Sequence, residues 1–186
     1  MPEPLPVHTI GHSTRTIDAF VDLLRVGEVR LVVDIRTVPR SRRNPQYNED
    51  VLPEELAERQ IGYLRIAELG GLRGKSKDAP PDLNGFWTNQ SFHNYADYAL
   101  SDSFQGGFTR LLDVAAERRA AIMCAEAVWW RCHRRIVADY LLNEGREVYH
   151  LMDPARAEPA KLTSEAEPYG SGLRYPAHDL FSGNFS

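Results

Sequence analysis

Short apolar runs alternate along most of this chain with segments in which apolar residues recur at helical spacing. The run over residues 30–36 is almost continuously apolar, as is typical of a strand buried on both faces of a parallel sheet. Strands are also expected over residues 7–11, 61–66, 120–123 and 147–152, and helices over residues 17–26, 52–59, 92–99, 104–115 and 132–144. This alternation predicts an α/β fold, in which a mostly parallel sheet is flanked by helices in a Rossmann-like layering with right-handed crossovers.

The length and the local composition predict one folded domain and a tail. A chain of 186 residues can bury one core, and neither an internal repeat nor a strong change in composition marks a second. We therefore expect a single α/β domain over residues 1–154. Residues 155–186 are rich in Pro, Gly, Ser and charge, so we expect an irregular C-terminal tail that is packed on the surface or partly disordered.

Net charge, cysteine content and hydropathy exclude several classes of protein. The formal charge of -4 argues against a protein that coats nucleic acid over its whole surface, so any such contact must be local. Two cysteines and no signal-like apolar segment at the N-terminus indicate free thiols in the reducing cytoplasm. No run approaches the roughly 20 apolar residues that span a bilayer, so no membrane partner is expected. The oligomeric state is left open.

Polar residues follow three of the expected strands. Gly11, His12 and Ser13 come after the first strand, Asp34 and Arg36 end the second, and Cys124 and Glu126 follow the fourth. Ligands of parallel α/β sheets bind outside the carboxyl ends of the strands, so these residues are expected to share one edge of the sheet.

The segment over residues 121–135 places both cysteines beside a carboxylate, an imidazole and the paired guanidinium groups of Arg134 and Arg135. We expect Cys132, His133 and Arg134 to lie on the first turn of a helix, where unpaired N–H groups and the helix dipole favour negative charge. That setting favours a thiolate at Cys132. Cys124 follows a buried strand and is either an inert core thiol or a functional one.

Several separated motifs in this order resemble a known family. They are Thr9-Ile10-Gly11-His12-Ser13, Val33-Asp34-Ile35-Arg36 with Pro39 and Ser41-Arg42, Leu69-Gly70-Gly71, and Cys124-Ala125-Glu126 followed by Cys132-His133-Arg134. Over about residues 7–153 the chain resembles the bacterial and archaeal family named domain of unknown function 488. The resemblance implies a compact α/β fold in which these residues form the shared polar set; it implies no particular substrate or reaction. Members of that family often carry an acidic residue or proline where this chain has Val128-Trp129-Trp130.

The residue types suggest two sets of roles at this edge of the sheet. For catalysis, Cys124 or Cys132 is the candidate nucleophile or a close contact of the substrate, and Glu126, Asp34 and His133 are candidates to move protons. For substrate binding, guanidinium groups hold phosphate or carboxylate, and the candidates are Arg36, Arg42 and Arg134 together with Gly11, His12, Ser13, Gly70 and Gly71. The alternative is structural: Arg36 or Arg134 can form salt bridges with Asp34 or Glu126 instead.

No cofactor is predicted. A metal is not excluded, and its ligands would be Cys124, Cys132 and His12 or His133, with Glu126 as a further candidate. Adjacent Cys132 and His133 diverge by roughly 100° on a helix, however, which makes joint ligation awkward. The glycine-rich segment over residues 70–76 is not a nucleotide triphosphate loop, because Leu69 occupies the position where that motif needs its first glycine.

These residues favour a small cytoplasmic hydrolase or transferase that acts on a phosphate-bearing or nucleotide-like anion. One alternative is a non-catalytic module that binds nucleic acid through a basic and aromatic surface, composed of residues 40–43, Tyr47, Phe86, Trp87, Trp129 and Trp130. The other is a thiol redox sensor that forms a reversible disulfide between Cys124 and Cys132.

Overall fold

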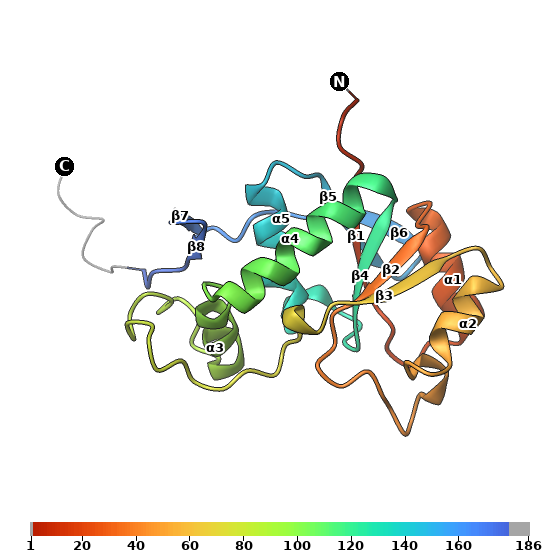
Figure 1. Ribbon diagram of the computed structural model, residues 1–186, viewed down its shortest axis with the longest axis horizontal. Helices are drawn as coiled ribbons and strands as arrows, with labels where there is room; N and C mark the ends of the chain where they lie inside the picture. Colours follow the sequence, from red (N-terminus) through yellow and green to blue (C-terminus); the bar gives the residue numbers. More distant parts are fainter. Residues whose placement is uncertain (1, 179–186) are drawn as a thin grey trace.

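A computed structural model describes residues 2–178 of the chain and contains one central six-stranded sheet (Figure 1). The strand order is β3-β2-β4-β1-β5-β6. The first five strands are parallel, and the last pairs with β5 in the antiparallel direction. The strands are β1 (Val7–Gly11), β2 (Leu31–Asp34), β3 (Gly62–Arg65), β4 (Ala120–Cys124), β5 (Val148–Met152) and β6 (Arg156–Pro159).

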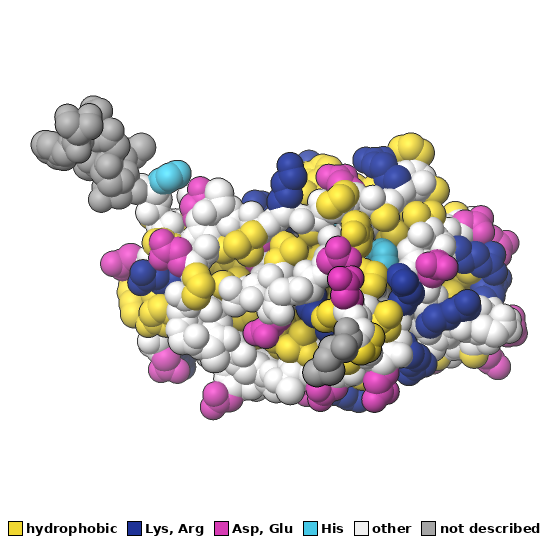
Figure 2. All heavy atoms as spheres, turned by 90° about the horizontal axis from the view of Figure 1, so that it is seen from above, with side chains coloured by type: hydrophobic (Ala, Val, Ile, Leu, Met, Phe, Trp, Pro, Cys, Tyr) yellow, Lys and Arg dark blue, Asp and Glu magenta, His cyan; other side chains and the backbone are white. Residues whose placement is uncertain are grey.

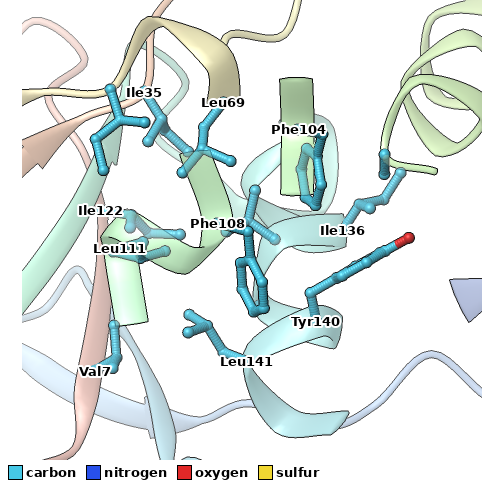
Figure 3. Packing of buried hydrophobic residues seen from close by; sticks show 14 of the residues in the cluster. Val7, Ile35, Leu69, Phe104, Phe108, Leu111, Ile122, Ile136, Tyr140 and Leu141 are labelled. Carbon is cyan, nitrogen blue, oxygen red and sulfur yellow. The ribbon is translucent and has the colours of Figure 1, made fainter. Parts of the chain in front are cut away.

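Helices cover both faces of the sheet (Figure 1). The helices are α1 (Ile17–Val26), α2 (Leu52–Ala57), α3 (Gln90–Tyr98), α4 (Asp102–Glu117) and α5 (Arg134–Asn143), with short 3₁₀ turns η1 (Pro45–Tyr47), η2 (Ala67–Leu69) and η3 (Trp129–Arg131). Successive side chains of a strand point to opposite faces. Val33 and Ile122 therefore join the core under α4 and α5, whereas Val32 and Met123 join the core under α1 and α2. Figure 3 shows Ile122 packed with residues of these two helices, such as Leu111 and Ile136.

The strand order explains where a site can form. The chain leaves β1 and β2 through α1 and α2, toward the β3 edge of the sheet. It leaves β4 through α5, on the opposite face and toward β5. Because β4 lies between β1 and β2, connections diverge on both sides of its carboxyl end, and such a switch point opens a crevice in parallel sheets.

The predicted α/β fold with a mostly parallel sheet is confirmed. One boundary near the thiols differs: Trp129–Arg131 form a 3₁₀ turn, Cys132 is extended (φ -125°, ψ 147°), and α5 begins only at Arg134. The expectation that Cys132 and His133 lie on the first helical turn is therefore wrong. Within the described residues, no helix is long and apolar enough to cross a membrane.

The segment after Pro154 is more regular than its composition predicts. It supplies the edge strand β6 and a hairpin of β7 (Glu167–Tyr169) and β8 (Gly172–Arg174). Tyr175 is fully buried, and its hydroxyl donates a hydrogen bond to Asp139 Oδ2 of α5 (2.8 Å). The tertiary contacts of a few apolar side chains override the local signal here. Residues 179–186 of the expected tail, which include Phe181, lie outside the described residues.

Candidate functional site

A cavity of about 440 Å³ lies at the carboxyl ends of β2 and β4. Its lining comes from the loops after β2, η2 and β4, from the start of α3, and from the segment that leads into α5. The lining residues are Arg36, Thr37, Val38, Gly71, Leu72, Asn89, Ser91, Phe92, Cys124, Ala125, Glu126, Arg131, Cys132 and His133. This volume lies within the range of small-molecule sites, about 300–1,000 Å³.

Arg36 is held rigidly at the floor of this cavity. Its Nε and Nη2 donate to the two carboxylate oxygens of Asp34 (2.9 and 2.7 Å), and Nη2 also donates to the Tyr47 carbonyl (2.7 Å). Tyr63 donates its hydroxyl proton to the same carboxylate (2.5 Å). Both members of this salt bridge are buried, so the structural alternative for Arg36 is present and also orients the guanidinium.

His12 supports Arg36 from behind and does not line the cavity. Its Nδ1 lies 2.8 Å from the Ser13 carbonyl and must donate there, so Nε2 accepts from Arg36 Nη1 at 3.3 Å. Burial, with a smaller contribution from the Arg36 charge, lowers the pKa of His12 to about 4. The ring also stacks on Tyr47, with centroids 4.3 Å apart. His12 is therefore neutral at pH 7 and positions Arg36.

The two cysteine thiols are free and buried, and each affects the ionisation of the other. Cys124 Sγ lies 3.6 Å from the Glu126 carbonyl oxygen, and Cys132 Sγ lies 3.5 Å from His133 Nδ1. Burial alone raises a thiol pKa, but the neighbouring Cys132 thiol and the charge of Arg134 outweigh burial and lower the pKa of Cys124. Burial and the neighbouring Cys124 raise the pKa of Cys132 well above its usual range. Of the two thiols, Cys124 is therefore the more easily ionised, whereas the sequence favours Cys132.

Arg134 supplies the positive charge beside these thiols. Its side chain is fully buried, and its Nη2 donates to the Ala127 carbonyl (3.1 Å). Within the described residues, Nε and Nη1 have no hydrogen-bond partner. A buried charge without compensation costs several kcal/mol. The Arg134 charge lowers the pKa of the Cys124 thiol, so ionisation of Cys124 supplies a negative charge that compensates this guanidinium.

His133 borders both the cavity and the thiol pair. Its Nε2 lies 2.8 Å from the Ile35 carbonyl and must donate there, which leaves the Nδ1 lone pair facing Cys132 Sγ at 3.5 Å. Burial, together with the Arg134 charge, lowers the pKa of His133 to about 4. His133 is therefore a neutral acceptor for the Cys132 proton at pH 7.

This arrangement predicts how the two thiols react with iodoacetamide. Cys124 is expected to be labelled well below the unperturbed thiol pKa of about 8.5, and Cys132 only at higher pH. Arg134→Met, which removes the charge, should move the midpoint of Cys124 labelling upward by about one pH unit or more, whereas Arg134→Lys should keep it low. Mass spectrometry of each cysteine across pH measures the midpoints. Labelling of Cys124 only after denaturation contradicts this prediction.

The predicted site residues fall into two groups. Six line the cavity: Arg36, Gly71, Cys124, Glu126, Cys132 and His133. The others do not line it: Asp34, His12 and Arg134 are buried behind the lining, Arg42 is exposed, and Gly11, Ser13 and Gly70 belong to the surrounding backbone. Asp34 positions Arg36 and, being fully buried, is not placed to exchange protons with a ligand.

Two glycines allow the backbone to close around the thiols. A Cβ on Gly11 would lie 1.6 Å from the Glu126 carbonyl oxygen, so the loop after β4 can approach β1 only at a glycine. A Cβ on Gly71 would lie 2.4 Å from His133 Nδ1.

Two parts of the cavity were not predicted from the sequence: the Arg131 guanidinium and the wall formed by the start of α3. Arg131 is exposed and lines the cavity, but its sequence position alone gave no reason to prefer it to its neighbours. Asn89, Ser91 and Phe92 come from the start of α3, about 30 residues before Cys124. The one available signal was Asn89, a good helix cap, whose Oδ1 accepts from the backbone N–H of Ser91 (2.9 Å).

The aromatic residues considered for base stacking on nucleic acid are mostly covered. Tyr47 is fully buried under His12, and Trp87 is 6% exposed. Trp129 stacks on His150, with centroids 4.6 Å apart, whereas Trp130 remains 46% exposed. On the face seen in Figure 2, Lys and Arg side chains are interspersed with Asp and Glu. This distribution differs from a continuous basic face.

Among residues 2–178, no group of three or more His, Cys, Asp or Glu side chains could hold a metal ion.

The comparisons with known proteins bear on the family. Neither a curated protein nor a solved structure matches the chain. The model of one family, described as domain of unknown function DUF488, matches residues 16–141, which include β2–β4 and both cysteines. The chain therefore belongs to the DUF488 family.

Proposed function

We propose that this protein is a thiol-dependent hydrolase or transferase that acts on a small anionic substrate. The observation that carries the proposal is a thiol of lowered pKa, Cys124, which lines a cavity together with two guanidinium groups, Arg36 and Arg131. Perturbed thiols in clefts are characteristic of reactive sites. Both cysteines are free thiols, which suits a reducing compartment such as the cytoplasm.

The guanidinium groups of Arg36 and Arg131 have N–H donors that can bind an anion. Of the five N–H donors of Arg36, three bind Asp34 and Tyr47 and one faces His12, which leaves one on Nη1 among the described residues. Arg131 is exposed and lines the cavity. A substrate anion can therefore bridge a fixed and an adaptable guanidinium.

The proposed reaction has two steps, and the side chains at the thiol site supply the nucleophile, an acid and a base. The Cys124 thiolate attacks the electrophilic carbon or phosphorus of the substrate, a bond to sulfur forms, and the leaving group departs with its electron pair. Cys132, whose thiol neighbours Cys124, supplies a proton to the leaving group. Water or a second substrate, deprotonated by the exposed Glu126 carboxylate, then attacks the intermediate and releases Cys124 as a thiolate. Protonated Glu126 releases its proton to solvent, and Cys132 takes one up, which restores the starting state.

A pair of alkylating reagents tests this proposal without knowledge of the substrate. Iodoacetate carries an anion where iodoacetamide carries a neutral amide of similar size. Iodoacetate is expected to label Cys124 with saturable kinetics and about tenfold faster than iodoacetamide, since a charged hydrogen bond contributes about 1.5–3 kcal/mol. Arg131→Gln should abolish the preference. The matched control, Arg43→Gln in the exposed loop, should retain it.

Two results would refute the proposal. One is linear, unsaturable labelling by iodoacetate at a rate no greater than that of iodoacetamide. The other is a preference for iodoacetate that survives in the Arg131→Gln protein.

The contact between the thiols also favours a second candidate function, thiol redox sensing. A peroxide would oxidise Cys124 and Cys132 to a disulfide and be reduced to water or an alcohol. Rapid, reversible loss of both free thiols at low peroxide, absent in Cys132→Ser, supports this function; over-oxidation of Cys124 with Cys132 still free argues against it.

A further inference from the structure

We infer that the substrate of this site is a mononucleotide, whose base lies on Phe92 and whose phosphate lies near Arg36, Arg131 and Cys124. The inference rests on the proposed function and adds the substrate class to it. It depends on the wall of the cavity that α3 contributes, which none of the reactive groups occupies.

The Phe92 ring is a preorganised aromatic surface. It lines the cavity and is stacked on Trp87, with centroids 5.0 Å apart and planes 20° apart. Trp87 is itself buried, with the Arg135 guanidinium over its ring at 4.9 Å and the edge of Tyr175 at 5.2 Å. Because these contacts fix Trp87, the Phe92 ring loses little freedom when a planar ligand stacks on it.

Hydrogen-bonding groups beside this ring distinguish a heterocyclic base from a purely apolar group. Asn89 Oδ1 accepts from the backbone N–H groups of Ser91 and Phe92 (2.9 and 3.2 Å), which fixes the plane of the amide. Asn89 and Ser91 line the cavity. The only side-chain hydrogen bonds of Asn89 in the described part of the chain use its Oδ1, so its amide donors are available to a ligand. A nucleobase presents ring nitrogens and carbonyl oxygens to such donors, whereas an acyl chain or a phenyl group does not.

The rest of the lining fits the other parts of a nucleotide. Val38 and Leu72 line the same cavity and are 58% and 74% exposed, so apolar surface is available to cover a planar ligand. Glu126 offers a carboxylate, the group that commonly accepts hydrogen bonds from ribose hydroxyls. Arg36 and Arg131 complete the lining with donors for a phosphate.

A single nucleotide fits these observations better than a nucleic acid strand. The aromatic platform is one ring inside a cavity of about 440 Å³. Of the other candidate stacking residues, Tyr47 and Trp87 are buried, and Trp130, which is 46% exposed, does not line the cavity. Binding of single strands normally uses several exposed aromatic side chains along a basic groove.

Protection of Cys124 from iodoacetamide tests the inference with matched probes. The probes are the 5′-monophosphates of adenosine, guanosine, cytidine and uridine, with ribose 5-phosphate and inorganic phosphate as controls that lack the base. At least one nucleotide is expected to protect Cys124 at a concentration about tenfold or more below that of ribose 5-phosphate, since stacking contributes about 1–3 kcal/mol per base.

The Phe92→Leu variant separates the contribution of the base to the binding affinity from that of the phosphate. Leucine keeps an apolar contact with Trp87 but removes the ring. The affinity for the nucleotide should fall about tenfold, toward that of ribose 5-phosphate, while the affinity for ribose 5-phosphate stays the same. Calorimetric titration of both proteins measures these affinities directly.

The possible failures are distinguishable. Equal protection by nucleotides and ribose 5-phosphate, or an unchanged nucleotide affinity in Phe92→Leu, overturns the nucleotide assignment but leaves the anion-binding thiol enzyme intact. Nucleotide binding that does not protect Cys124 overturns the placement of the ligand in this cavity, and salt-sensitive binding of oligonucleotides without binding of mononucleotides overturns the substrate class. Failure of all phosphates to protect, together with no preference for iodoacetate, removes the proposed function itself.

Discussion

Lowering the pH from 7 to 5 is expected to cost the protein about 7 kcal/mol of stability, because four histidines are held neutral in the folded state. Burial lowers the pKa of His8, His12 and His133 to about 4 and that of His150 to about 3, with the charges of neighbouring arginines adding to the effect. Unfolded histidines take up protons near pH 6.5. The unfolded chain therefore binds more protons, and stability falls as the pH drops from about 6.5 toward 4.

That loss is comparable to the whole stability of many domains, about 5–15 kcal/mol, so we expect acid unfolding near pH 5. Urea denaturation at pH 8, 7, 6 and 5 measures the slope. His150→Gln should reduce the loss of unfolding free energy between pH 7 and 5 by about a quarter. At pH 8 the histidines are neutral in both states, so a difference between the variant and the original protein there measures lost packing alone. The buried Asp139 works in the opposite direction, because burial raises its pKa and its protonation stabilises the folded state in acid. A free energy of unfolding that is flat between pH 7 and 5 contradicts the prediction.

Asp34→Ala is expected to destabilise the protein by about 3–5 kcal/mol, because it leaves the buried Arg36 guanidinium without a counter-charge. Asp34 is fully buried and Arg36 is 5% exposed. The substitution also removes the acceptor of the Tyr63 hydroxyl, which lies 2.5 Å from the carboxylate. The midpoint of urea denaturation, with an unchanged slope, measures the loss.

Two matched variants identify the cause of that loss. Asp34→Asn keeps the volume and part of the hydrogen bonding, so its cost should be intermediate. The double change of Asp34→Leu with Arg36→Met removes both charges and should recover most of the stability, because apolar residues often replace a buried ion pair without loss. A cost below about 1 kcal/mol for Asp34→Ala, or no recovery in the double variant, would show that the ion pair does not hold this part of the fold.

The fold was predictable because its strands carry their signal locally. The continuous apolar run around Val32 predicts a central strand, and the periodicity of residues 17–26 predicts a covering helix; both are present. The segment around Tyr175 gave no such signal, because its burial depends on Asn84 and Asp139 from distant parts of the chain. Contacts of this kind are set by tertiary packing and leave no local period.

The site was predictable as a location but not in its electrostatics. Strand ends brought Arg36 and Cys124 to one cavity, as parallel topology requires. Which thiol is the more easily ionised depended on a two-residue difference in where α5 begins and on the burial of Arg134, and neither follows from residue order. The contribution of Phe92 could not be predicted either, because it requires knowledge of how α3 packs against the end of the sheet.

The pairing of Tyr175 with the loop at Asn84 has a consequence for how the molecule is made. The Tyr175 backbone N–H donates to Asn84 Oδ1 (2.9 Å), and its carbonyl accepts from Phe86 N–H (3.0 Å), across separations of 91 and 89 residues. At about 5–20 residues per second, a ribosome adds Tyr175 roughly 5–20 s after Asn84. All six strands of the central sheet precede Tyr175 in the chain. In a nascent polypeptide, all strands of the sheet and both thiols are therefore synthesised before Tyr175 can bind the loop at Asn84 and hold the segment with Asn89 and Phe92 in place. This wall of the cavity is completed after the sheet.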